Sequence, residues 1–149
     1  MQIARWLHLT GIVVWVGGMF FAHFALRPAA AELAPPVRLP LLLRTLSGFF
    51  GWAGAAIVVV LGSGAALYAV PGSPGAPGWA VQAMTTIGLV MTLVYAYIVL
   101  VPYRRMREAV VASDWPAGGA AMGLIRRLVG LNLALGLFTV GIATLGRGL

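Results

Sequence analysis

Long apolar runs, separated by short stretches that carry arginine, proline or glycine, set the pattern of this chain. A helix needs about 20 apolar residues to cross the hydrocarbon core of a bilayer. Four runs reach that length, at residues 3–26, about 46–70, about 79–101 and about 123–145. The pattern therefore predicts an all-α integral membrane protein, a four-helix bundle in a single transmembrane domain over residues 1–149.

The connections between these runs predict the orientation of the chain. Residues 71–78 hold only Pro, Gly, Ser and Ala and predict a tight turn without charge. The first connection, interrupted by Pro35, Pro36 and Pro40, holds Arg27, Arg38 and Arg44. The third connection, bounded by Pro102 and Pro116, is assigned Arg104, Arg105, Arg107, Arg126 and Arg127. Because arginine accumulates on the cytoplasmic side, both connections are predicted there and both termini on the periplasmic side of a bacterial inner membrane.

Composition changes this picture by excluding other classes of protein. The chain is 61% hydrophobic and 9% charged, whereas a soluble domain has about 45–50% apolar and about 25% charged residues. A soluble enzyme and a nucleic-acid module are therefore excluded, and the net charge of +7 is interpreted as a topology signal. The chain has no cysteine, which excludes disulfides, thiolate metal sites and c-type haem attachment.

The chemically interesting side chains of the first run share one broad helical face. At about 100° per residue, Trp15 and Met19 lie close to His8, and Arg5 and His23 lie about 60° away. This face is predicted to be turned toward the bundle interior. In the third run, Met84 and Met91 likewise share a face.

The two histidines are the candidate functional residues, because an ionisable group inside a span is by default a functional-site hypothesis. His8 and His23 are 15 residues apart, or about 22 Å along a helix. They therefore cannot share one metal ion within a chain, and one is expected near each membrane boundary. The alternative is that each histidine is a hydrogen-bonded interfacial residue without a ligand.

Residues 8–28 read HLTGIVVWVGGMFFAHFALRP. The histidine, the tryptophan seven residues later, the small-residue pair and the closing Arg-Pro resemble the first helix of CopD-type membrane proteins, which are associated with bacterial copper resistance and uptake. The resemblance matches His8 to the family histidine, Trp15 to its tryptophan and His23 to a second histidine. A weaker similarity links the segment to HemJ-type proteins, implicated in protoporphyrinogen oxidation. Those rely on a lysine in a later helix, and this chain has no lysine.

The first functional hypothesis is a b-type haem that transfers electrons within or across the membrane to an unknown redox partner. This function is compatible with a haem-dependent oxidoreductase. Haem iron takes an imidazole and a second axial histidine or methionine. His8 and Met84 are expected at equal depth, and His8 or His23 could also pair across a homodimer. Arginines at the membrane surface could hold the propionates, and the candidates are Arg5, Arg27 and Arg104.

The second hypothesis is copper passage across the inner membrane, because imidazole and thioether ligands suit Cu(I). The candidate donors at successive depths are His8 with Met84, then Met91, then Met19 with His23. Haem is placed marginally ahead of copper, and a non-catalytic scaffold is the third hypothesis. A hydrolase is disfavoured, because the only acids, Glu32, Glu108 and Asp114, lie in the connections and form no acid/base couple.

Overall fold

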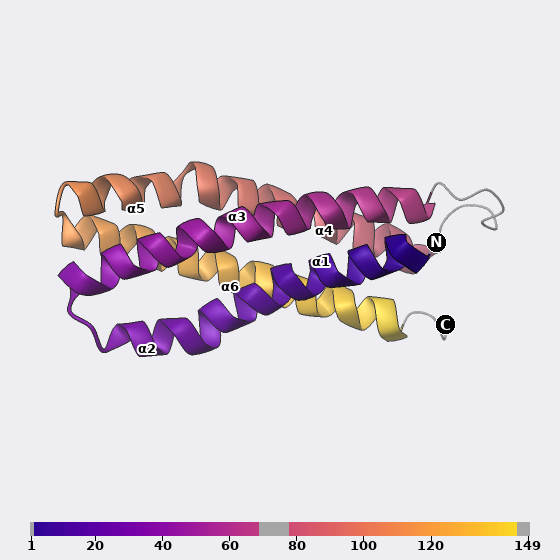
Figure 1. The fold of residues 1–149 in the computed structure, drawn as a ribbon, viewed down its shortest axis with the longest axis horizontal. Helices are drawn as coiled ribbons and strands as arrows, with labels where there is room; N and C mark the ends of the chain where they lie inside the picture. The colour runs from indigo at the N-terminus through magenta and orange to yellow at the C-terminus, as the bar shows by residue number, and fades with distance from the viewer. Residues whose placement is uncertain (1, 69–77, 146–149) are drawn as a thin grey trace.

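The computed structural model describes residues 2–68 and 78–145, which are almost entirely helical (Figure 1). The elements are α1 (Gln2–Phe21), the π-helical turn η1 (Ala22–Leu26), α2 (Arg27–Ala31), α3 (Pro35–Tyr68), α4 (Trp79–Leu100), α5 (Pro102–Val111) and α6 (Trp115–Leu145). Helices long and apolar enough to cross a membrane form four stretches, Gln2–Ala31, Pro35–Leu67, Trp79–Val111 and Trp115–Leu145. The predicted all-α, four-span architecture is confirmed.

The helices extend well beyond the predicted apolar runs at the arginine-bearing end. The first connection was expected over residues 27–45, but the chain leaves the helix only at residues 32–34. Pro35 and Pro36 occupy the first turn of α3, where a missing N–H costs nothing. At the third connection only residues 112–114 are non-helical, and the Asp114 carboxylate accepts the Ala117 N–H at 3.0 Å to cap α6. The predicted turn at 71–78 lies outside the described residues except for Gly78.

A π-helical turn joins α1 to α2, and the sequence accounts for its position. Pro28 has no N–H to donate to the carbonyl of Phe24, and its ring would crowd that carbonyl in a regular α-helix. The helix widens just before the proline, and the Arg27 N–H bonds to Ala22 O, five residues back. This turn carries His23.

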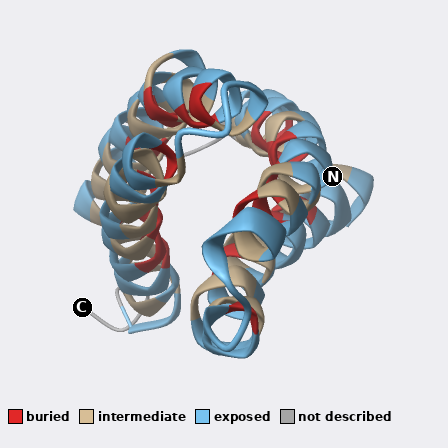
Figure 2. Ribbon diagram, turned by 90° about the vertical axis from the view of Figure 1, so that its left-hand side faces the viewer, coloured by how far each residue is buried: buried red, intermediate tan, exposed pale blue. Residues whose placement is uncertain are grey.

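The bundle consists of two packed units, one of α1 with α3 and one of α6 with α4 and α5. α1 packs along α3, and α6 packs along both α4 and α5. The Tyr95 hydroxyl of α4 donates to Phe50 O of α3 at 2.7 Å and links the two units. Viewed along the long axis, the ribbons form an incomplete ring (Figure 2).

α1 and α6 cross near the middle of the bundle. A Cβ built on Gly136 of α6 would lie 3.0 Å from Cγ2 of Val16. The two helices then diverge toward the end that holds residues 32–34 and 112–114 (Figure 1). This separation creates the space in which the second histidine lies.

The surface of the bundle is apolar, and large side chains of the first helix fill its interior. Trp15 and Met19 are only 4% and 2% exposed, which confirms the predicted inward face at these two residues, whereas Arg5 of the same predicted face is exposed. Large apolar side chains point outward along the same helices, including Trp52, Val58 and Leu93. A surface of this kind fits a lipid environment, because exposure of so much apolar area to water would be unfavourable.

Most of the arginines lie at one end of the bundle. The arginine-rich end, defined by the connections 32–34 and 112–114, has eight arginines on its helices. These are Arg27, Arg38, Arg44, Arg104, Arg105, Arg107, Arg126 and Arg127. Gln2 and Leu145 lie at the opposite end (Figure 1). That the arginine-rich end faces the cytoplasm stays a prediction from the arginine rule.

Candidate metal-binding site

His8 lies on α1 with its ring held against α3. Its Nδ1 is 3.0 Å from Val60 O and 3.1 Å from the hydroxyl oxygen of Ser63. The carbonyl of Val60 can only accept a hydrogen bond. The Nδ1 atom must therefore carry the proton in the neutral ring, and Nε2 carries the lone pair.

Ser63 completes this arrangement. Its hydroxyl donates to Val59 O at 2.5 Å, so its oxygen remains free to accept from His8. Ser63 is buried, with 7% exposure. An imidazole whose Nδ1–H is fixed by a carbonyl acceptor is the usual form of a metal-ligating histidine, with Nε2 as the ligand atom. No protein group bonds to Nε2 of His8 in the part of the chain that the structure describes.

A glycine on α3 sets the distance of the His8 ring from that helix. A Cβ built on Gly64 would lie 3.3 Å from Cε1 and 3.6 Å from Nδ1 of His8. Such contacts are tighter than ordinary side-chain packing, so an alanine would push the ring away. The glycine therefore allows the ring to reach the carbonyl of Val60.

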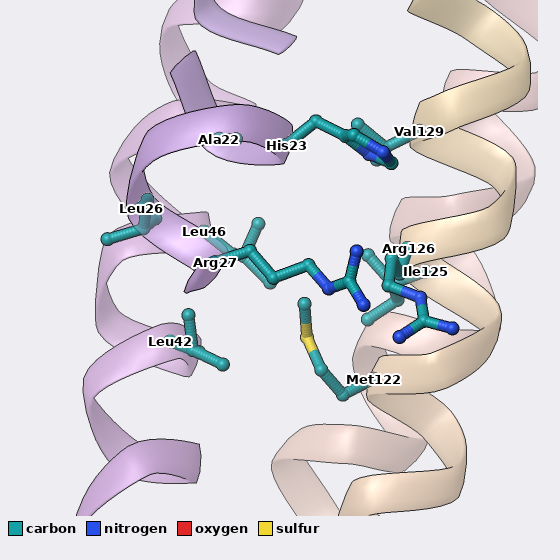
Figure 3. Close-up of a pocket in the computed structure, with 10 residues that line it drawn as sticks. All are labelled: Ala22, His23, Leu26, Arg27, Leu42, Leu46, Met122, Ile125, Arg126 and Val129. Carbon is teal, nitrogen blue, oxygen red and sulfur yellow. The ribbon is translucent and has the colours of Figure 1, made fainter. Parts of the chain in front are cut away.

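His23 lies at the other candidate depth, in the π turn, with its ring directed toward α6 (Figure 3). A Cβ built on Gly130 would lie 3.2 Å from Cε1 of His23. Arg27 reaches across the same space toward α6, Arg126 lies beside α6, and the thioether of Met122 lies between the helices (Figure 3). Both imidazoles are half-buried, and each lies over a glycine of the neighbouring helix.

Thioethers fill the interior between the two histidines. Met19 and Met91 are 2% and 3% exposed. The methyl carbon of Met91 would lie 3.2 Å from a Cβ on Gly136, near the crossing of α1 and α6. Met84 is half-buried, about 10 Å along α4 from Met91.

One buried polar group near the crossing lacks a partner. Asn132 is 2% exposed, and its Nδ2 donates to Met91 O at 3.1 Å. Its Oδ1 accepts no hydrogen bond from any described residue. An unpaired buried carbonyl costs about 1–3 kcal/mol, which marks this position as polar within an otherwise apolar interior.

Other predicted site residues are not brought together. α1 and α4, which carry His8 and Met84, do not pack against each other over the described residues. Arg5 and Arg104 are exposed, and neither forms an ion pair with a described carboxylate. Over residues 2–68 and 78–145, no group of three or more His, Asp or Glu side chains converges.

Several residues at these two sites were not predicted as site residues. Ser63, Gly64 and Gly130 contact the imidazoles only through packing between helices, which hydropathy does not encode. Arg126 was counted with a connection, whereas it lies within α6 and lines the same cavity as Arg27. A glycine on each partner helix at the depth of each histidine is the one signal that the sequence offers.

The fold and its candidate sites define a multi-pass helical membrane protein with imidazole and thioether donors at several depths. Residues 43–145 match the family model described as CopD, copper resistance protein D. The chain belongs to this family of copper-related membrane proteins. The match covers α4, α5, α6 and most of α3, whereas His8 and His23 lie outside it. No curated protein and no solved structure matches the chain.

Proposed function

We propose that this CopD-family protein binds copper at His8 and conducts Cu(I) through the membrane along imidazole and thioether donors. The observation that carries the proposal is the 3.0 Å contact between Nδ1 of His8 and Val60 O, from which the tautomer follows. With Nδ1–H fixed on Val60 O, Nε2 is a free lone pair on a neutral ring, as metal ligation requires.

The donor types favour Cu(I) over harder ions. Imidazole and thioether are soft ligands that select Cu(I), whereas carboxylates select Mg²⁺ or Ca²⁺. All three carboxylates of the chain, Glu32, Glu108 and Asp114, lie in or beside the two connections of the arginine-rich end. The interior therefore provides soft ligands for a monovalent cation, and these ligands include no carboxylate.

The path consists of successive donors rather than a single cage. His8 would take the ion at the end opposite the arginines, and Met84 and Met91 provide sulfur farther along α4. Met19 and His23 follow one turn apart on the α1–η1 rod. Weak sites in series favour transfer, because conduction requires binding that is strong enough for entry and weak enough for release.

A b-type haem for electron transfer is the second candidate, and the same observation favours it. A lone pair on Nε2 also suits axial ligation of haem iron. Met84 would be the second axial ligand, and Arg5, Arg27 and Arg104 would hold the propionates. Because α1 and α4 do not pack against each other, a macrocycle that joins His8 to Met84 would have to lie between them.

One measurement separates the candidates. The purified protein would be loaded with Cu(I) under anaerobic conditions, and copper content and the visible spectrum would be recorded. We expect bound copper and no Soret band, and His8→Ala should lose copper while Leu9→Ala, an exposed neighbour, retains it. A Soret band that disappears in His8→Ala would establish the haem instead. Neither signal in the wild-type protein would leave only the scaffold.

A further inference from the structure

The cavity where α1 and α6 diverge at the arginine-rich end is lined by His23 and by a pair of arginines, of which Arg126 has no role in either metal hypothesis. Arg27 and Arg126 both line it; the Arg27 side chain extends across the space toward α6, and the Arg126 side chain lies beside α6 (Figure 3). The enclosed part of the cavity measures about 30 Å³, and the space around it is open to the outside. Both arginines are half-buried.

Neither arginine is neutralised by the protein. The three acidic side chains are all among the described residues, and none of them forms an ion pair with Arg27 or Arg126. Two partly buried guanidinium groups that line one cavity favour an anion there, because like charges repel and an anion between them is attracted to both. Guanidinium groups recognise phosphate through paired charge-assisted hydrogen bonds.

The depth of the pair points to the source of the phosphate. Arg27 follows Val16 by eleven residues, and Arg126 precedes Gly136 by ten. Each arginine is therefore about 15 Å from the α1–α6 crossing along its own helix. Half the hydrocarbon thickness of a bilayer is also about 15 Å, so with the crossing placed at the bilayer midplane the pair is level with lipid headgroups.

The walls of the cavity fit the rest of a lipid. Leu26, Leu42, Leu46, Ile125 and Val129 line it alongside the arginines. Leu42, Leu46, Ile125 and Val129 are already buried by the protein, so an acyl chain would chiefly cover the half-buried Leu26, from which a free phosphate ion would gain nothing. Basic pockets between helices on the cytoplasmic side are known sites for anionic headgroups.

We infer that the Arg27–Arg126 cavity binds the phosphodiester of an anionic phospholipid, with an acyl chain against its aliphatic wall. The lipid would bridge α1 and α6 where the protein itself leaves them apart. This inference is independent of which metal the protein binds.

The test compares two double variants of the full-length protein in detergent. Native mass spectrometry would measure binding of dioleoylphosphatidylglycerol, with dioleoylphosphatidylcholine as the zwitterionic comparison. Replacing Arg27→Gln and Arg126→Gln together should weaken phosphatidylglycerol binding about tenfold or more, because two charge-assisted bonds are lost. The matched control, Arg105→Gln with Arg107→Gln, removes two exposed arginines of α5 at the same end and should retain binding. Equal losses in the two double variants would overturn the site, because they would indicate diffuse surface charge.

A second measurement uses only wild-type protein and does not depend on a variant folding. Phenylglyoxal modifies accessible arginines, and peptide mass spectrometry locates them. Phosphatidylglycerol should protect Arg27 and Arg126 but leave Arg105 and Arg107 reactive, and inorganic phosphate should protect neither pair. Equal protection by inorganic phosphate would overturn the lipid as the source, and no protection by the lipid would overturn the site. A Soret band in wild-type protein that is lost with both arginines would assign the pair to a haem carboxylate and also overturn it.

Discussion

The imidazole of His8 lies directly against Gly64, close enough that a Cβ at that glycine would lie 3.3 Å from Cε1 and 3.6 Å from Nδ1. His23 has the same relationship to Gly130, at 3.2 Å and 3.6 Å. Two imidazoles on one helical rod are thus each positioned by a glycine on a different neighbouring helix. The ring position depends on the missing methyl group in both cases.

Gly64→Ala should weaken copper binding at His8 about tenfold, which is the low end of effects on groups that orient a metal-ligating histidine. The new methyl group displaces the ring and lengthens the hydrogen bond from Nδ1 to Val60 O. A competition titration with a Cu(I) chelator measures the affinity. Gly62→Ala is the control, because a Cβ there meets nothing within 4 Å and carries the same gain in helix propensity. Equal affinities in the two variants would mean that Gly64 does not position the ring.

Ser63→Ala should have a smaller effect than loss of the ligand itself. Val60 O still accepts the Nδ1 proton at 3.0 Å, so the tautomer is kept and only one of two acceptors is lost. We expect Cu(I) affinity to fall by about tenfold or less, whereas His8→Ala abolishes it. Thr85→Ala, which removes an exposed hydroxyl on α4, should leave the affinity unchanged. A loss as large in Ser63→Ala as in His8→Ala would make the hydroxyl a ligand rather than an orienting group.

The class of protein and its inward-facing residues could be predicted from the sequence, because hydropathy and helical periodicity act locally. Trp15 and Met19 were placed inside by periodicity alone, and both are buried. The partners of His8 could not be predicted, since Val60 and Ser63 are 52 and 55 residues away and meet it only through packing of α1 on α3.

The arginine-rich end shows a second limit. Apolar runs end where arginine begins, but the backbone hydrogen bonds of a helix continue through arginine, which is a good helix former. Arg126 was therefore counted with the third connection although it falls within the predicted run 123–145, and the cavity that it lines together with Arg27 went unpredicted. The π turn at His23 also depends on how the helix accommodates Pro28, which hydropathy does not report.

Asn132 predicts an unusual response to substitution. Asn132→Leu removes a buried unpaired carbonyl and one hydrogen bond to Met91 O. These effects oppose each other, so we expect the free energy of unfolding to change by no more than about 1 kcal/mol. Asn132→Asp adds a carboxyl group to the same apolar interior and should destabilise the protein by about 3 kcal/mol or more. Thermal unfolding in detergent measures both variants, and a large loss for Asn132→Leu would indicate that Oδ1 has an important partner.

The orientation can be tested with reporters at the two ends of the bundle. Alkaline phosphatase fused after Leu149 should be active, because the eight arginines at the other end hold that end in the cytoplasm. Green fluorescent protein inserted after Asp114, in the connection at the arginine-rich end, should fluoresce. The opposite pattern at both positions would reverse the topology and exchange the depths of His8 and His23.

Gly136 tests whether the crossing of α1 and α6 holds the bundle together. A Cβ at this position would lie 3.0 Å from Cγ2 of Val16 and 3.2 Å from Cε of Met91. Gly136→Ala should therefore destabilise the protein by about 1–3 kcal/mol through overpacking. At Gly141, one turn and a half farther along α6, a Cβ meets nothing within 4 Å, so Gly141→Ala should be neutral or slightly stabilising.

A double variant makes this test specific to the crossing. Val16→Ala removes the methyl groups nearest the new Cβ, so combining it with Gly136→Ala should restore part of the lost stability. A double-mutant cycle measured by thermal unfolding should give a favourable coupling of about 0.5–3 kcal/mol. The same cycle with Gly141→Ala should give no coupling. If the Val16–Gly136 cycle is also additive, the two helices do not meet at this point. The inference that Arg27 and Arg126 lie at the same depth, which is measured from this crossing, would then fail.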